Sequence, residues 1–113
     1  MAKNKVTSHA SPLEVEAALK QWGSRLRTAR LARNLSMDHV AAKLGMDRRV
    51  VSAAEAGKPG TAVAVYCGLM WIYGLVAQLN ELADPARDDL TLRALAQRAH
   101  AYPSTKGALD NDF

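Results

Sequence analysis

The stretch "SMDHVAAKLGMDRRVVSAAEAG", residues 36–57, contains the start and stop signals of two short helices. Ser36 and Asp47 are residue types that cap helix N-termini, because their side-chain oxygens accept hydrogen bonds from free backbone N–H groups. Gly45 and Gly57 follow the two segments as helix stops. The sequence therefore predicts two helices of about eight residues, joined by about three residues.

The two helices divide into an apolar inner face and a cationic outer face. The inner residues are Val40, Ala41, Leu44, Val51 and Ala54. Arg48, Arg49 and Ser52 remain on the outer side of the second helix. A helix that enters the major groove of DNA needs a partner helix, a tight turn and small or cationic outer side chains, so this stretch is a candidate DNA reader. The alternative is that the two arginines only solvate a helix face.

Apolar residues at helical spacing flank this stretch on both sides. Upstream, Leu19, Trp22, Leu26 and Ala29 predict a first helix that ends near Asn34. Downstream, a fourth helix is expected to start at Gly60 or Thr61, and Gly74 separates it from a fifth. The apolar stripes of these two helices are Val65, Leu69 and Ile72, and Leu75, Leu79 and Leu82.

The residues beyond the fifth helix predict a separate extension. Asp84 before Pro85 is typical of a helix cap followed by a first-turn proline. An apolar stripe follows at Leu92, Leu95, Ala96 and Ala99, and Pro103 ends it. We therefore predict an all-α chain with a flexible arm over residues 1–12, a compact five-helix domain over residues 13–83, and a helical extension and tail over residues 84–113.

The composition of the 113 residues favours helices and places the positive charge in the first half. Aromatic residues make up 5% of the chain, and Ala, Leu and Val supply most of the other apolar residues. Residues 1–58 contain eleven Lys or Arg against five Asp or Glu, and residues 59–113 contain four against six. The first half is therefore the candidate binder of a polyanion.

The remaining composition argues against several other classes of protein. Cys67 is the single cysteine, so we expect no internal disulfide and a reducing, cytoplasmic compartment. The apolar stretch 61–79 contains two glycines and has polar ends, so buried helices are expected there, with no membrane span. No secretory signal is expected at the N-terminus. The three histidines lack neighbours at ligand spacing, and no nucleophile stands near a base, so we expect no metal, no cofactor and no enzyme activity.

Residues 23–60 resemble the helix-turn-helix core of the bacterial Xre and phage-repressor family. The matching residues are Gly23, Arg30, Leu35, Ser36, Val40, Ala41, Leu44, Gly45, Asp47, Glu55 and Gly57. The resemblance continues more weakly through about residue 83, and it implies a lambda-repressor-like fold. It also implies a partly buried ion pair between Arg30 and Glu55, the alternative being a solvated glutamate.

The resemblance further implies that the third helix contacts DNA bases just after its cap, Asp47. By position, the contacting residues are Arg48, Arg49, Ser52 and Ala53. Arginine can present two donors to a guanine or grip a phosphate. The lysines expected to neutralise phosphates are Lys43 and Lys58, with Lys3 and Lys5 in the arm.

Three positions depart from the family pattern. Met37 stands where a glutamine often touches the DNA backbone, Ala53 where a long polar residue is common, and Ala54 where a bulkier aliphatic is common. Base reading is therefore expected to depend on the two arginines.

One such unit contacts few base pairs, so useful specificity requires two copies about one helical turn apart on DNA. The apolar residues after residue 65 exceed what one face of two short helices can bury. The predicted dimer interface is Met70, Trp71, Tyr73, Leu75 and Val76. The alternative is that all of these residues belong to the core.

These expectations lead to a sequence-specific transcription regulator that binds double-stranded DNA. It would act as a dimeric autorepressor that binds a palindromic operator through its third helix and blocks polymerase. The alternative function, suggested by some members of the resembled family, is an antitoxin. Such a protein neutralises a partner toxin and represses its own operon, and residues from 84 onward would then hold the toxin.

Overall fold

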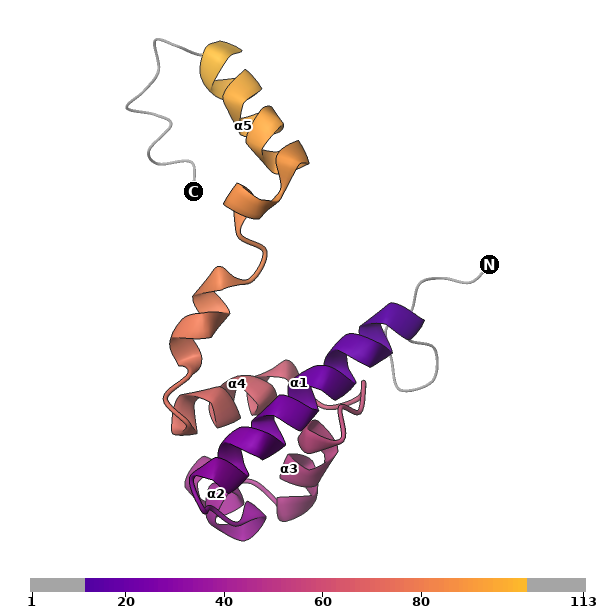
Figure 1. The fold of residues 1–113 in the computed structure, drawn as a ribbon, viewed down its shortest axis with the longest axis vertical. Helices are drawn as coiled ribbons and strands as arrows, with labels where there is room; N and C mark the ends of the chain where they lie inside the picture. Colours follow the sequence, from indigo (N-terminus) through magenta and orange to yellow (C-terminus); the bar gives the residue numbers. More distant parts are fainter. Residues whose placement is uncertain (1–11, 102–113) are drawn as a thin grey trace. The chain divides into compact units, whose positions relative to one another are not determined.

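The computed structural model describes residues 12–101, and this part of the chain contains helices and turns but no strand (Figure 1). The elements are α1 (Leu13–Ala32), α2 (Met37–Leu44), α3 (Arg48–Glu55), α4 (Val63–Ile72), the 3₁₀ segments η1 (Val76–Glu81) and η2 (Pro85–Arg87), and α5 (Asp89–Ala101). The all-α prediction is confirmed. The predicted arm up to residue 11, with Lys3 and Lys5, and the tail with Pro103 lie outside the described residues. Among residues 12–101, no helix combines the length and the apolar character that crossing a membrane requires.

The predicted caps hold α2 and α3 at their ends. The Ser36 hydroxyl accepts a hydrogen bond from the backbone N–H of His39 at 3.0 Å, and the Asp47 carboxylate accepts one from the N–H of Arg49 at 2.7 Å. Gly45 ends α2 in the left-handed conformation at φ +65, which glycine adopts without steric cost. The three residues 45–47 therefore join the two helices, as predicted. In contrast, α4 begins later than predicted, because Ala62 occupies its N-cap and provides no side-chain hydrogen bond.

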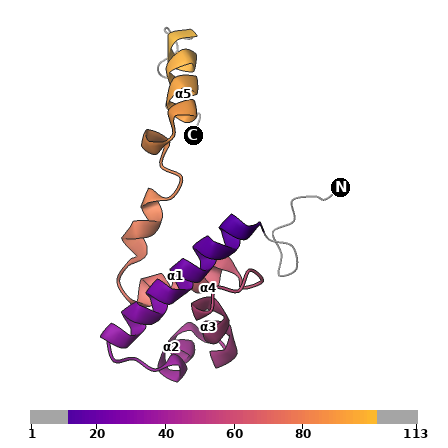
Figure 2. The same cartoon turned by 45° about the vertical axis from the view of Figure 1, so that its right-hand side comes forward.

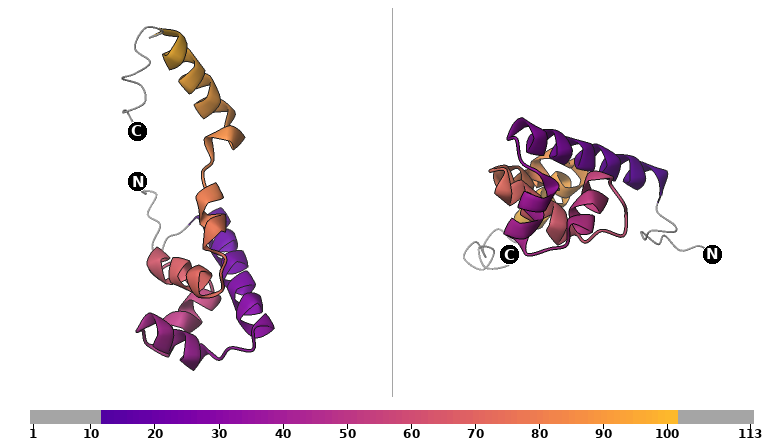
Figure 3. Two further views of the ribbon diagram at one scale, coloured as in Figure 1. Left: turned by 90° about the vertical axis from the view of Figure 1, so that its left-hand side faces the viewer. Right: turned by 90° about the horizontal axis from the view of Figure 1, so that it is seen from below.

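The chain divides into two units, Met1–Leu79 and Asn80–Phe113. In the first unit α3 packs against α1, α2 and α4, and Figures 2 and 3 show α1 lying along one side of the other three helices. Trp22 of α1 stacks on Tyr66 of α4 with their ring centroids 4.5 Å apart. The buried core consists of Leu26, Val40, Ala41, Val51, Ala54, Val65, Tyr66, Leu69, Met70 and Tyr73. The core therefore holds α3 from three sides and leaves its fourth side to solvent.

The contact between α1 and the end of α3 is a close backbone approach that depends on two glycines. A Cβ atom on Gly23 would lie 2.4 Å from the carbonyl oxygen of Ala54, and one on Gly57 would lie 2.5 Å from the Cα of Lys20. Gly57 also has φ +70, which disfavours any residue with a Cβ. These glycines fix the position of α3 on α1.

Tyr73 closes the core directly after α4. Its side chain is buried, and the Arg33 guanidinium lies 5.5 Å from the centroid of its ring and donates to its carbonyl oxygen at 2.9 Å. Within residues 12–101 the buried Tyr73 hydroxyl has no hydrogen-bond partner. Burial, helped by the negative charge of Glu55, raises the pKa of Tyr73 to about 12.

Replacing Tyr73 with phenylalanine is expected to stabilise the domain by up to about 1 kcal/mol at neutral pH, because it removes a buried hydroxyl without a partner. The stability advantage of the phenylalanine variant over the wild type should grow as the pH rises. The pKa of Tyr73 rises from 10.0 in the unfolded chain to about 12 in the folded chain, because burial opposes ionisation of the phenol. The wild type therefore keeps its full stability below pH 10 and loses stability as the pH rises from 10 towards 12. By about pH 11 the wild type should lose a further ~1.4 kcal/mol relative to the variant. Urea unfolding of both proteins at the two pH values measures this, and a variant less stable than the wild type at neutral pH would contradict it.

The segment after α4 differs from the predicted fifth α-helix. Val76–Glu81 forms the 3₁₀ segment η1, which has no buried residue. Leu75 and Leu79 pack partly against the core, whereas Leu82 is 64% exposed. Short α-helices in water depend on a packed apolar face, and here that face ends at Leu79. Leu79 is also the last residue of the first unit, whereas the sequence predicts the boundary after residue 83.

In the described part of the second unit, a 3₁₀ segment and an α-helix replace the single predicted helix. The Asp84 carboxylate accepts a hydrogen bond from the N–H of Ala86 at 2.9 Å, as its cap role predicts. However, η2 ends at Arg87, because Asp88 is extended at φ −126 and ψ 104. The helix α5 begins at the next residue, and its leucines Leu90, Leu92 and Leu95 are exposed.

Candidate nucleic-acid interface

The first turn of α3 presents two adjacent arginines at the surface. The side chains of Arg48 and Arg49 are 64% and 90% exposed, so neither is folded into the protein. Ser52 is exposed one turn further along the same helix, while Val51 and Ala54 are buried on the opposite face. The predicted division of α3 into an inner apolar face and an outer cationic face is therefore confirmed.

Asp47 both caps α3 and binds the arginine two residues later. Its carboxylate accepts hydrogen bonds from Arg49 Nε at 3.3 Å and from Arg49 Nη2 at 3.1 Å. These hydrogen bonds hold the pKa of the Asp47 carboxyl below its ordinary value, so the group is ionised at neutral pH. Because Asp47 uses two of the five guanidinium N–H groups, three remain for a ligand. They include both N–H groups of Nη1.

Arg48 lies on the side of α3 that faces α2. Its Nε is 3.6 Å from Oδ1 of Asp38, and both side chains are exposed. An exposed pair at this distance contributes little to stability and exchanges readily with another anion. The two arginines therefore differ, since Arg49 is held by two hydrogen bonds to the cap while Arg48 has a loose partner on the neighbouring helix.

The predicted phosphate contacts Lys43 and Lys58 are both exposed, at the end of α2 and just beyond α3. Met37, which departs from the family pattern, is partly buried against the core, so it is a packing residue. Residues 37–58 carry four cations, at positions 43, 48, 49 and 58, and two exposed carboxylates, at positions 38 and 47. The surface is therefore cationic overall, and both carboxylates already pair with its arginines.

The predicted ion pair between Arg30 and Glu55 is confirmed, and it is buried. Arg30 Nε donates to Glu55 Oε2 at 2.6 Å, and Arg30 Nη2 donates to Oε1 at 3.1 Å. A third donor, Nη1, binds the carbonyl oxygen of Leu35 at 2.9 Å. Arg30 and Glu55 are 6% and 8% exposed, and the hydrogen bonds to Glu55 raise the pKa of Arg30 above its ordinary value. This arginine therefore ties α1 to the end of α3 and to the turn before α2.

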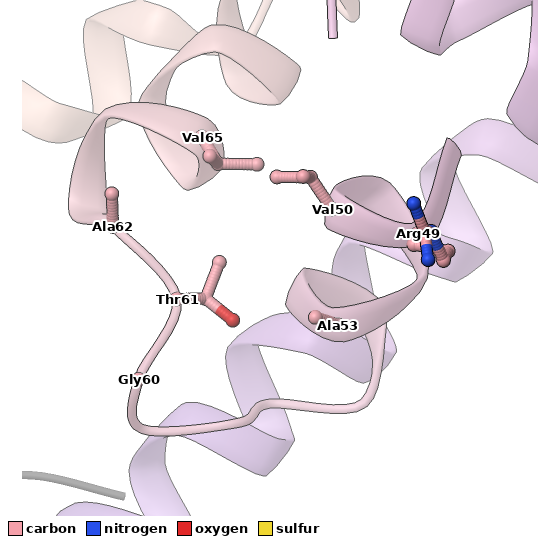
Figure 4. Close-up of a pocket in the computed structure, with 7 residues that line it drawn as sticks. All are labelled: Arg49, Val50, Ala53, Gly60, Thr61, Ala62 and Val65. Carbon is pink, nitrogen blue, oxygen red and sulfur yellow. The ribbon is translucent and has the colours of Figure 1, made fainter. Parts of the chain in front are cut away.

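An open hollow of about 350 Å³ lies between α3, the loop that follows it and the start of α4 (Figure 4). It is lined by Arg49, Val50, Ala53, Gly60, Thr61, Ala62 and Val65. Of these, the sequence pattern singles out Arg49 and Ala53 as surface residues for recognition, but it does not reveal the hollow. The hollow forms only when the loop is folded back beside α3, which no local signal in residues 58–62 indicates.

The predicted dimer interface is wrong for two of its five residues. Met70 and Tyr73 are 6% and 4% exposed, because both face the core of their own chain. Trp71 and Val76 are exposed, and Leu75 is half-buried. Cys67 and Val63 lie one and two turns before Trp71 on α4. Val63 and Trp71 are 63% and 64% exposed. The outer face of α4 is thus defined by Val63, Cys67 and Trp71.

No family model matches the chain, and the comparisons with curated proteins and with solved structures give no match either.

Proposed function

We propose that the protein is a sequence-specific DNA-binding transcription regulator and that α2 and α3 form a helix-turn-helix unit of the lambda-repressor-like type. The observation that carries this proposal is the pair of exposed arginines on the first turn of a short, capped helix that three other helices support. The N-terminal part of a recognition helix reaches base edges, and guanidinium groups there match guanine and phosphate.

In this proposal α3 enters the major groove and α2 crosses the DNA backbone. Arg49 contacts a guanine through Nη1 and Nη2, while Asp47 holds the other side of the guanidinium and limits its rotation. Arg48 leaves Asp38 and binds a phosphate or a second base. Lys43 and Lys58 add phosphate contacts, which position the helix without reading sequence.

Replacing Asp47 with asparagine is expected to lower the preference of the protein for the guanine contacted by Arg49 by about five- to tenfold. This loss is part of the base discrimination that a bidentate arginine–guanine pair provides. Asparagine still caps the helix, but it cannot offer two carboxylate oxygens to Arg49. Non-specific affinity should rise slightly because a negative charge is removed near the phosphates. Competition binding between the preferred duplex and one with that guanine replaced measures the change. The matched variant Asp38→Asn should leave the preference at this base intact, and equal effects of the two substitutions would contradict an orienting role for Asp47.

We further propose that two copies bind a palindromic site, because one α3 contacts few base pairs. The outer face of α4 supports this step. The helix has no charged residue, and Val63 and Trp71 are both more than 60% exposed. A helix that is apolar all round is normally buried, and a second copy would cover the uncovered side.

Selection of bound fragments from random duplex DNA tests this proposal. We expect enrichment of one sequence with two inverted half-sites about one helical turn apart, each containing a guanine. The selection should be run in parallel with the Arg48→Ala/Arg49→Ala variant, which should enrich nothing. The absence of any enriched sequence from the wild type would reject the proposed function, and enrichment of single half-sites would reject the dimer.

The exposed leucines of the second unit favour a second candidate function, the antitoxin-type binding of a partner protein. Leu82, Leu90 and Leu92 are 64%, 74% and 44% exposed, and an exposed apolar patch is typical of a protein-interaction site. Co-expression with the product of an adjacent gene and co-purification through residues 80–113 would test it. Loss of that complex in a Leu90→Glu/Leu92→Glu variant that still binds DNA would assign the two activities to different units.

A further inference from the structure

The lining of the hollow beside α3 is mostly apolar. Figure 4 shows Val50 of α3 and Val65 of α4 pointing towards one another at one end, with Ala53 and Thr61 across the gap from each other. Ala62 and Gly60 complete the loop side, and Arg49 is the one charged residue of the lining. The hollow therefore suits an apolar group and offers little to a phosphate.

The hollow is continuous with the proposed DNA-reading surface. Arg49 and Ala53 are four residues apart on α3, so they lie on the same side of the helix one turn from each other. In the proposed complex, a base pair next to the one contacted by Arg49 would lie beside Ala53. Base edges in the major groove present hydrogen-bonding groups at every pair, and the only apolar group among them is the C5 methyl of thymine.

We propose that the hollow receives the C5 methyl group of a thymine adjacent to the guanine contacted by Arg49. This inference rests on the proposed function, because it requires α3 to lie in the major groove. At about 350 Å³ the hollow is larger than one methyl group, so the C5–C6 edge of the pyrimidine enters with it. Cytosine, which lacks the methyl, and purines, which present polar atoms, leave the apolar lining uncovered.

Replacement of thymine by deoxyuridine tests the proposal, because it deletes the methyl group and keeps the base pair. In the duplex obtained by selection, each thymine is replaced in turn and affinity is measured by fluorescence anisotropy. Binding should weaken about fourfold when the thymine next to the Arg49 guanine is replaced, which is the change expected for one buried methyl group. Replacement of thymines outside the half-sites should change nothing.

A matched pair of variants assigns the effect to the hollow. Ala53→Leu places a larger side chain into it, and thymine and uracil duplexes should then bind equally well. Ala42→Leu makes the same change on an exposed position of α2 outside the lining, and the fourfold difference should persist. Thr61→Ser, which removes one methyl from the lining and keeps the hydroxyl, should reduce the difference.

The outcomes separate this inference from the proposed function. A selected duplex that binds equally well with uracil at every thymine overturns the methyl site and leaves DNA binding standing. A uracil effect that Ala53→Leu does not alter shows that the methyl is read elsewhere, which also overturns it. If no duplex is selected, both proposals fail.

Discussion

Replacing Glu55 with alanine is expected to lower the free energy of unfolding by about 3 to 5 kcal/mol, because it leaves the Arg30 guanidinium buried without its carboxylate. The described part of the first unit, residues 12–79, has 68 residues. A domain of that size is stable by roughly 3 to 10 kcal/mol in total. The variant should therefore melt tens of degrees lower or fail to fold at all. Thermal and urea unfolding, followed by circular dichroism, measure this loss.

Two further variants distinguish the loss of this pair from a general effect of losing a glutamate. Glu14→Ala removes a carboxylate from an exposed position of α1 and should change the stability by less than about 0.5 kcal/mol. Arg30→Met combined with Glu55→Leu replaces both charges with apolar groups and should recover much of the lost stability. A Glu55→Ala variant as stable as Glu14→Ala would show that the buried pair contributes nothing.

This pair also shows how far the sequence predicts the fold. Ser36, Gly45 and Asp47 mark the ends of α2 and α3 correctly, because capping is local and depends on a few neighbouring backbone groups. The partners Arg30 and Glu55 are 25 residues apart, and no periodicity links them. Their pairing could be predicted only from the resemblance to a known family.

The incorrect expectations concern packing between elements. The sequence predicts Met70 and Tyr73 as surplus apolar residues, yet both are buried in the core, whereas Trp71 is exposed. The apolar stripe of residues 75–82 predicts an α-helix, but within residues 12–101 Leu82 stays 64% exposed and Val76–Glu81 forms a 3₁₀ segment. In both cases the sequence correctly identifies an apolar segment. It does not show which side of that segment packs against the rest of the chain.

The candidate site also combines features that the sequence predicts with features that depend on the tertiary structure. The exposure of Arg48 and Arg49 follows from their places on a helix whose opposite face is apolar, so the sequence predicts it. Their partners depend on the tertiary structure, since Asp38 reaches Arg48 only because α2 packs against α3. The hollow beside Ala53 likewise exists only because a loop and α4 close over one side of α3.

The second large effect is expected at the DNA surface, where Arg49→Ala should weaken binding to the selected duplex by about five- to 150-fold. If Arg49 reads guanine, the loss should disappear when that guanine is replaced, because neither protein then makes the contact. Arg48→Ala should instead weaken binding to all duplexes by a similar factor if Arg48 holds a phosphate. In that case the slope of log K against log salt should fall by about 0.9.

The two mechanisms require separate measurements because removal of either arginine lowers the positive charge equally. Arg93→Ala, in α5, removes the same charge from the second unit and serves as the control for long-range electrostatics. Binding isotherms for the three variants at four salt concentrations, on the selected duplex and on one with the guanine replaced, separate base reading from phosphate contact. The Arg48→Ala/Arg49→Ala variant should fall to the level of non-specific binding. If it instead binds the selected duplex as tightly as the wild type while remaining folded, α3 is not the recognition helix, because no other exposed side chain of its first turn can donate two hydrogen bonds to a base.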